Sequence, residues 1–154
     1  MQKADGEIIH LWSARDALVL KALSLLLAGV LPISPACTHV KGHGGLKSTV
    51  RRVYEQRPNY RFVLHTDGKG YYASIDHFLL MEQLAKYIKD KFILNLLWQY
   101  LHRMVECGGF YREIKQGISR GCPLSPLIGA FFLTELDRHF DRTGCSMRAT
   151  WMTS

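Results

Sequence analysis

Two sequence blocks constrain the fold of this chain more than any other feature. The first, Asp67–His77, follows the compact apolar run Phe62–Leu64, so a strand over Arg61–Thr66 is expected to end at its aspartate. The second, Gly117–Leu127, is rich in turn residues and ends in Ser125-Pro126, a cap followed by proline at the first helical position. Each block therefore leads into a helix, and the chain is predicted to be α+β.

Cap signals and apolar spacing predict the other elements. Ser13-Ala14-Arg15-Asp16 fits a capping box, and Asp76 can cap a helix that begins at His77. Gly108-Gly109 predicts a hairpin turn between short strands. The helices expected from these signals cover residues 13–28, 47–54, 77–88, 92–105 and 125–140.

Composition favours one domain with an anionic partner. The 154 residues are 47% apolar and carry 20 basic against 13 acidic side chains, a net charge of +7, which puts nucleic acid first among partners. The apolar run Ala17–Ile33 is interrupted by Lys21 and is interpreted as a packed helix instead of an export signal or membrane span. The four cysteines, none in a C-x-x-C pair, favour reduced thiols and a cytoplasmic location (Cys37, Cys107, Cys122 and Cys145).

Asp67 is the first candidate for chemistry. A carboxylate at the end of a strand is held rigidly yet exposed, which suits a hard cation such as Mg²⁺, although Asp-Gly alone is also a common turn signal. The stretch Phe62–His77 resembles the first palm motif of bacterial reverse transcriptases of the group II intron or retron type. The resemblance implies that Asp67 is catalytic and binds Mg²⁺ (or Mn²⁺), and that the Gly68 carbonyl also reaches the metal. It further implies that Tyr72 packs under the nucleotide sugar; a sheet aromatic is the alternative.

The first motif departs from the family at Gly68, where an apolar residue is usual. Glycine keeps the carbonyl but loosens a strand by about 0.5–1 kcal/mol, so the metal geometry is expected to suffer.

Gly117–Leu127 resembles the second palm motif, Gly-x-Pro-Gln-Gly followed by Ser-Pro. The resemblance implies that the backbone at Gly121 approaches the template–primer or the nucleotide closely. Ser119-Arg120 replaces Pro-Gln here, so Arg120 is expected to contact phosphate in place of the glutamine. A plain turn with a helix cap would use the same residues.

A basic stretch precedes both motifs. Lys41–Ser48 is glycine-rich, but Leu46 stands where a Walker motif needs glycine, so a nucleotide phosphate loop is rejected. A finger loop near the RNA template is expected instead, with four cations on phosphates (Lys41, Lys47, Arg51 and Arg52).

The resemblance extends to Phe140 and implies the fingers and first half of the palm of a right-hand polymerase, with helices on a small antiparallel sheet. Residues 1–144 are interpreted as a partial reverse transcriptase domain and 145–154 as a non-homologous tail. The family next carries Tyr-x-Asp-Asp, which this sequence lacks. Trp151-Met152-Thr153 must be encoded TGG-ATG-ACN, and a neighbouring frame of that DNA encodes Asp-Asp. The hypothesis is a frameshift near Gly144–Met147; coincidence is the alternative.

The implied activity is RNA-directed DNA synthesis by two-metal transfer, with RNA template, primer and dNTP as partners and no membrane. Two-metal transfer needs carboxylates from two places, so this chain alone is expected to be inactive. Two alternatives stay open: a non-catalytic RNA-binding module, and half of a split reverse transcriptase completed by a palm–thumb chain.

Overall fold

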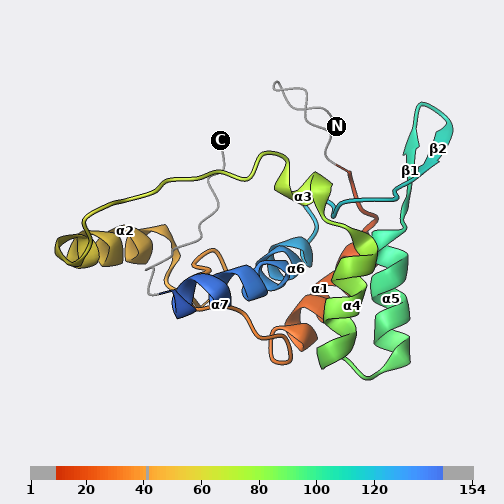
Figure 1. Cartoon of the computed structure of the whole chain (residues 1–154). Helices are drawn as coiled ribbons and strands as arrows, with labels where there is room; N and C mark the ends of the chain where they lie inside the picture. The colour runs from red at the N-terminus through yellow and green to blue at the C-terminus, as the bar shows by residue number, and fades with distance from the viewer. Residues whose placement is uncertain (1–9, 41, 144–154) are drawn as a thin grey trace. The chain divides into compact units, whose positions relative to one another are not determined.

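The computed structural model describes residues 10–40 and 42–143, and it is α+β, as predicted (Figure 1). The elements in chain order are α1 (Ala14–Leu27), α2 (Gly45–Gln56), the 3-10 helix η1 (Arg57–Asn59), α3 (Tyr71–Ser74), α4 (His77–Tyr87), α5 (Lys91–Leu101), β1 (Met104–Cys107), β2 (Phe110–Glu113), α6 (Ser125–Phe132) and α7 (Thr134–Arg142). Within this described part, no helix is long and apolar enough to cross a membrane.

The chain divides into two compact units. Of the described residues, the first unit contains 10–31 and 70–129, and the second contains 32–40, 42–69 and 130–143. The whole of the second sequence block, Gly117–Leu127, therefore lies in the first unit, together with residues 70–77 of the first block.

Leucines from three helices form the core of the first unit. They are fully or almost fully buried on α1, α4 and α5 (Leu20, Leu23, Leu27, Leu80, Leu84, Leu97 and Leu101), and each contributes about 1.5–3 kcal/mol. The helices α1 and α4 start at the predicted caps. The Ser13 hydroxyl accepts the Asp16 N–H at 3.1 Å. The Asp76 carboxylate accepts the Leu79 N–H at 2.8 Å.

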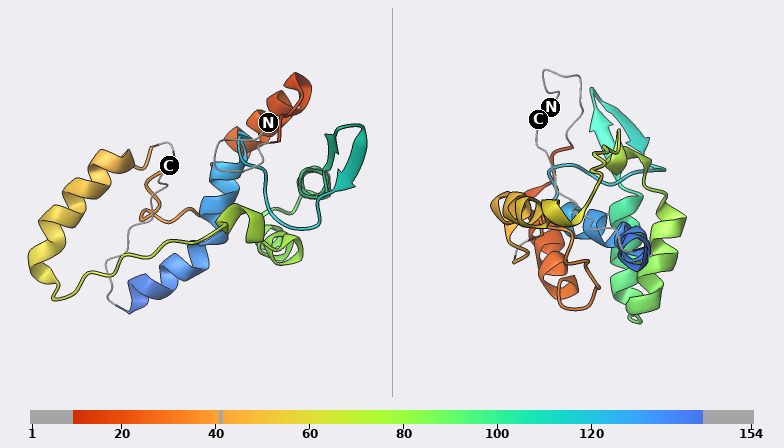
Figure 2. Two further views of the ribbon diagram at one scale, coloured as in Figure 1. Left: turned by 90° about the horizontal axis from the view of Figure 1, so that it is seen from above. Right: turned by 60° about the vertical axis from the view of Figure 1, so that its left-hand side comes forward.

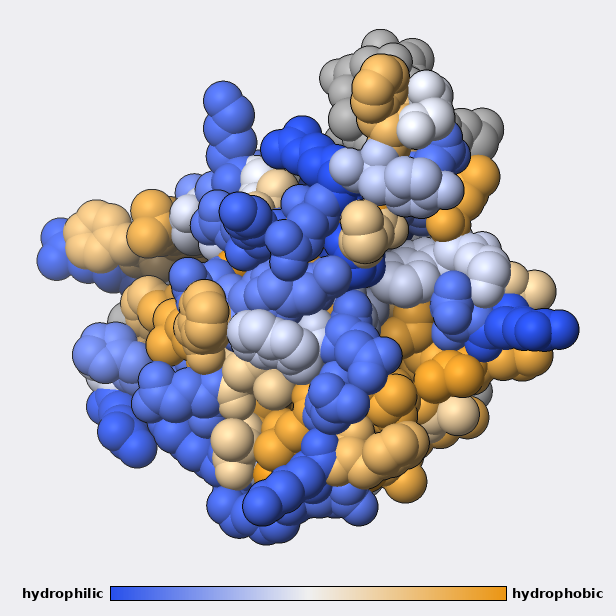
Figure 3. Space-filling model, turned by 90° about the vertical axis from the view of Figure 1, so that its right-hand side faces the viewer, coloured by the Kyte–Doolittle hydropathy of each residue, from blue (hydrophilic) through white to orange (hydrophobic). Residues whose placement is uncertain are grey.

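The hairpin of β1 and β2 projects beyond the end of α5 (Figures 1 and 2). Its turn is Gly108-Gly109, with Cys107 opposite Phe110, which confirms the predicted turn. The side chains of both strands are largely exposed, so the expected layer of helices packed on a sheet is not present in residues 10–40 and 42–143. Figure 3 shows the face with α4, α5 and the hairpin, where apolar side chains lie among polar ones.

Other boundaries differ from the predictions. Residues 61–69 form neither helix nor strand, and Phe62, Val63 and Leu64 are 83%, 78% and 88% exposed. The predicted strand over Arg61–Thr66 is therefore wrong for the described structure, because an apolar run becomes a strand only when a neighbouring backbone pairs with it. The helix predicted to reach Val105 stops at Leu101, where the chain enters the hairpin.

The second unit is held by polar contacts as well as apolar ones. The hydroxyls of Thr49 on α2 and Thr38 lie 2.6 Å apart. The Thr134 hydroxyl, at the start of α7, donates to the Pro32 carbonyl at 3.0 Å. Burial, and secondarily the carboxylate of Asp137, raises the pKa of the Cys37 thiol to about 12, so this cysteine is an unreactive structural residue.

Candidate functional site

The ends of the two sequence blocks are bonded to each other in the first unit. The Ile118 N–H donates to the Tyr72 carbonyl and the Gly117 N–H donates to the Ile75 carbonyl, both at 2.8 Å. The Gln116 side-chain amide adds a third bond, to the Ser74 carbonyl at 3.0 Å. Three bonds to the short helix α3 and its C-cap fix the start of the second block on the end of the first.

At Gly117 a side chain would collide with backbone atoms of α3. Its φ is +85°, and a Cβ placed there would lie 2.8 Å from the Ala73 carbonyl oxygen and 2.9 Å from the Tyr72 carbonyl oxygen. Both obstacles are backbone atoms, which cannot move aside as a flexible side chain can. Glycine at this position thus permits the close approach of the two blocks.

The Gly117 carbonyl oxygen accepts hydrogen bonds from two basic side chains. His77 Nε2 lies 2.9 Å from this oxygen and Arg103 Nη1 lies 3.3 Å from it. His77 is 2% exposed, and burial lowers its pKa, with the Gly117 bond acting in the opposite direction. Burial likewise lowers the pKa of Arg103, whose Nη2 lies 3.4 Å from His10 Nδ1.

A second buried network supports the middle of the Gly117–Leu127 block. The Ser125 hydroxyl donates to the Ser119 carbonyl, and its oxygen lies 2.8 Å from the Tyr100 hydroxyl. The Trp12 indole N–H donates to the Ser119 hydroxyl at 3.0 Å. Arg120 and Gly121 follow these anchored residues and are exposed. The backbone before the two predicted contact residues is therefore held firmly while they face solvent.

Tyr72, predicted to lie under a nucleotide sugar, is 9% exposed. Its ring centroid lies 5.8 Å from that of Tyr71, whose hydroxyl donates to the Gly129 carbonyl at 2.7 Å. We call α3 and the Gly117–Gly121 loop bonded to it the docked motif. Tyr72 belongs to the same docked motif as Arg120 and Gly121. Its role toward a sugar stays a prediction.

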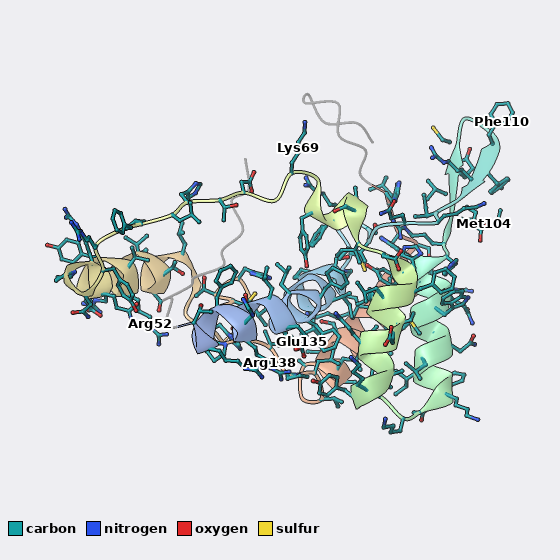
Figure 4. The ribbon with its side chains drawn as sticks, viewed as in Figure 1. Arg52, Lys69, Met104, Phe110, Glu135 and Arg138 are labelled. Atoms are coloured by element: carbon teal, nitrogen blue, oxygen red, sulfur yellow. The ribbon has the colours of Figure 1, made fainter. Side chains whose placement is uncertain are left out.

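Asp67 and Gly68 belong to the second unit, in the exposed segment without helix or strand. Lys69 follows them and is also exposed (Figure 4). Among the residues that the structure describes, no group of three or more His, Cys, Asp or Glu side chains could hold a metal ion. The described donors therefore do not fit a complete Mg²⁺ site, and Asp67 and Gly68 remain predicted ligands.

The predicted RNA contacts on α2 are exposed. Lys47 and Arg51 lie one helical turn apart, and Leu46, Val50 and Tyr54 line a shallow groove beside them. Arg51 Nε is 3.7 Å from the Glu55 carboxylate, an exposed pair. Arg52, labelled in Figure 4, projects from another side of the helix, and Lys41 lies outside the described residues. The structure thus groups two of the four predicted cations.

Sequence reasoning missed the side chains that hold the motif. Arg103 and Tyr100 carry no motif signal, because only the fold brings them to Gly117 and Ser125. His77 follows the Asp76 cap, and its position at the first turn of α4 was the one available hint.

Comparisons with known proteins find distant similarity in sequence. No protein-family model matches the chain. It is 24% identical over 159 residues to Protein YkfC of Escherichia coli K12, covering 96% of this chain and 41% of that protein. It is also 24% identical over 125 residues to the group II intron-encoded protein LtrA of Lactococcus lactis subsp. cremoris, covering 80% of this chain and 21% of that protein.

A yeast relative extends the same similarity. The putative COX1/OXI3 intron 1 protein of Saccharomyces cerevisiae is 24% identical over 127 residues, covering 80% of this chain and 15% of that protein. The chain spans less than half the length of each of these relatives. It is thus distantly similar to group II intron-encoded proteins.

Proposed function

We propose that this chain is the fingers and first palm part of an RNA-directed DNA polymerase of the group II intron type. The observation that carries the proposal is the bonding of Gly117 and Ile118 to Ile75 and Tyr72. The resemblance of the two blocks to palm motifs implies that they belong to one active centre, and bonds between their ends support this. The similarity to group II intron-encoded proteins supports the same assignment.

In this proposal Asp67 and the Gly68 carbonyl are ligands of Mg²⁺, which would stabilise charge during nucleotidyl transfer. Tyr72 contacts the sugar, Arg120 contacts phosphate, and the exposed backbone at Gly121 allows close approach of nucleic acid. The sequence contains no Tyr-x-Asp-Asp, the motif that carries the remaining carboxylates in this family, so Asp67 and Gly68 supply only part of a two-metal site. By itself the chain is expected not to polymerise.

RNA binding without catalysis is the second candidate function, and the exposed surface of α2 favours it. Lys47 and Arg51 carry positive charge next to Tyr54, which is 75% exposed, and Arg52 adds an exposed charge on another side of the helix. Cations on phosphates beside an exposed aromatic ring are typical of surfaces that bind single-stranded RNA.

Primer extension separates these functions. The chain is mixed with a polypeptide that carries a Tyr-x-Asp-Asp palm hairpin and a thumb, on an RNA template with a DNA primer. The polymerase proposal predicts Mg²⁺-dependent extension that Asp67→Asn abolishes while RNA binding persists. Salt-sensitive RNA binding with no primer extension in any mixture would contradict the polymerase proposal and support RNA binding without catalysis.

A further inference from the structure

The Gly117 carbonyl and the imidazole of His77 form a contact that the proposed chemistry does not use. A carbonyl oxygen only accepts hydrogen bonds, so His77 Nε2, at 2.9 Å, must carry the proton. The neutral imidazole then has a bare Nδ1. This atom is buried and has no hydrogen-bond partner among the described residues.

The surroundings of His77 oppose a second proton. The His102 ring centroid lies 4.9 Å away, and Arg103 shares the Gly117 carbonyl with His77. Two groups favour the charged form more weakly than burial opposes it. They are the Gly117 carbonyl, which accepts from Nε2, and the Asp76 carboxylate, which is already bonded to the Leu79 N–H. A proton on Nδ1 would place a buried charge beside a guanidinium without an acceptor.

We propose that His77 is a positioning residue, whose neutral imidazole holds the Gly117 peptide in its docked orientation and whose protonation releases it. Release would free the Gly117–Gly121 loop from α3 and so alter where Arg120 lies. That such a release would change contacts with nucleotide or RNA rests on the proposed function. The docking of Gly117 on α3 does not depend on the proposed function.

The sign of the pH effect follows from linkage. The ordinary histidine pKa of 6.5 applies to the released loop, and burial lowers the pKa in the docked form. The released form therefore binds the proton more readily, so docking is strongest above the ordinary pKa and weakens as the pH falls through it. One pH unit below 6.5, the loss of docking is at most about tenfold, the limit for a docked form that takes up no proton.

Nuclear magnetic resonance of the whole chain tests this proposal. Histidine ring spectra at neutral pH should show His77 protonated at Nε2. The hydrogen-exchange protection of the Gly117 and Ile118 amides should fall, by at most about tenfold, between about pH 7.5 and 5.5, while the Leu80 amide inside α4 keeps its protection. A proton found on Nδ1, or protection of Gly117 and Ile118 that does not change with pH, would overturn the proposal.

Variants assign the effect to His77. His77→Gln keeps a side-chain N–H donor that does not titrate, so docking should persist and lose its pH dependence. His139→Gln is the matched control, because His139 is an exposed residue of α7 in the second unit; it should keep the wild-type pH dependence. A pH dependence that survives in His77→Gln would refute the assignment. None of these readouts involves RNA or nucleotide, so they stand apart from the proposed polymerase function.

Discussion

The docked motif holds its candidate functional residues on a rigidly bonded loop, whereas α2 presents its candidate residues on an exposed helix surface. Around Gly117, backbone and buried side chains hold the loop to α3 through several bonds before any ligand arrives. On α2, Lys47 and Arg51 are exposed on one side of a helix with an uncovered apolar groove. The first arrangement suits precise positioning of a small group, whereas the second suits loose, salt-sensitive binding of a polyanion.

Of the changes that test this comparison, replacing Gly117 should lower the stability of the chain most. Gly117→Ala forces a Cβ against the Ala73 and Tyr72 carbonyl oxygens as well as an unfavourable φ. We expect it to lower the free energy of unfolding by about 3 kcal/mol or more, measured by urea denaturation.

Gly109→Ala is the matched control for that variant. Gly109 has the same φ of +85° but nothing within 4 Å of its hypothetical Cβ. It should cost only about 1–2 kcal/mol. Equal losses in the two variants would mean that Gly117 is not crowded by α3.

Removing the Tyr100 hydroxyl should weaken the support under Arg120 and Gly121. Tyr100 is buried, which raises the pKa of its hydroxyl, and that hydroxyl lies 2.8 Å from the Ser125 oxygen. Tyr100→Phe is expected to cost about 1–1.5 kcal/mol, because it leaves a buried polar atom with one partner fewer. Tyr111→Phe on the exposed face of the hairpin should cost nothing measurable by the same denaturation assay.

A stabilising change is expected in the second unit. Asp137 is 1% exposed on α7, and burial raises its pKa while the Ser34 hydroxyl lowers it in part. The folded state therefore binds the proton more tightly than the unfolded state, so this group costs stability as the pH rises through its folded pKa. Asp137→Asn should stabilise the chain at neutral pH by about 1 kcal/mol.

The pH dependence checks the cause of that gain. The advantage of Asp137→Asn should disappear in thermal denaturation below about pH 4, where the unfolded carboxyl is also protonated. An advantage that persists there would point to packing instead of charge. Glu113→Gln on exposed β2 serves as the control and should change little at either pH.

The smallest effect on stability should come from α2. Replacing both Lys47 and Arg51 with alanine should change the free energy of unfolding by less than about 0.5 kcal/mol. RNA affinity should fall, and the slope of log affinity against log salt should decrease by about two, measured by fluorescence anisotropy. Removing two exposed charges from the first unit, Lys86 and Lys91, is the control; an equal loss of affinity would show that net charge alone acts.

Local signals predicted local structure well. The caps at Ser13 and Asp76 and the Gly108-Gly109 turn lie where the residues place them, because each depends on bonds to near neighbours in the chain. The strand over Arg61–Thr66 did not form, since a strand depends on a partner that its own residues do not specify. For the same reason, Arg103 and His77 were found at Gly117 only through the fold.

The docking of Gly117 against Ala73 is the central claim, and a nuclear Overhauser measurement tests it most directly. The hypothetical Cβ of Gly117 lies 2.9 Å from the Ala73 Cα, so a Gly117 α-proton takes that place. A strong cross-peak between the α-protons of Gly117 and Ala73 is predicted, together with slow exchange of the Ile118 amide. Assigned resonances without that cross-peak, and with Ile118 exchanging as fast as an exposed amide, would contradict the account.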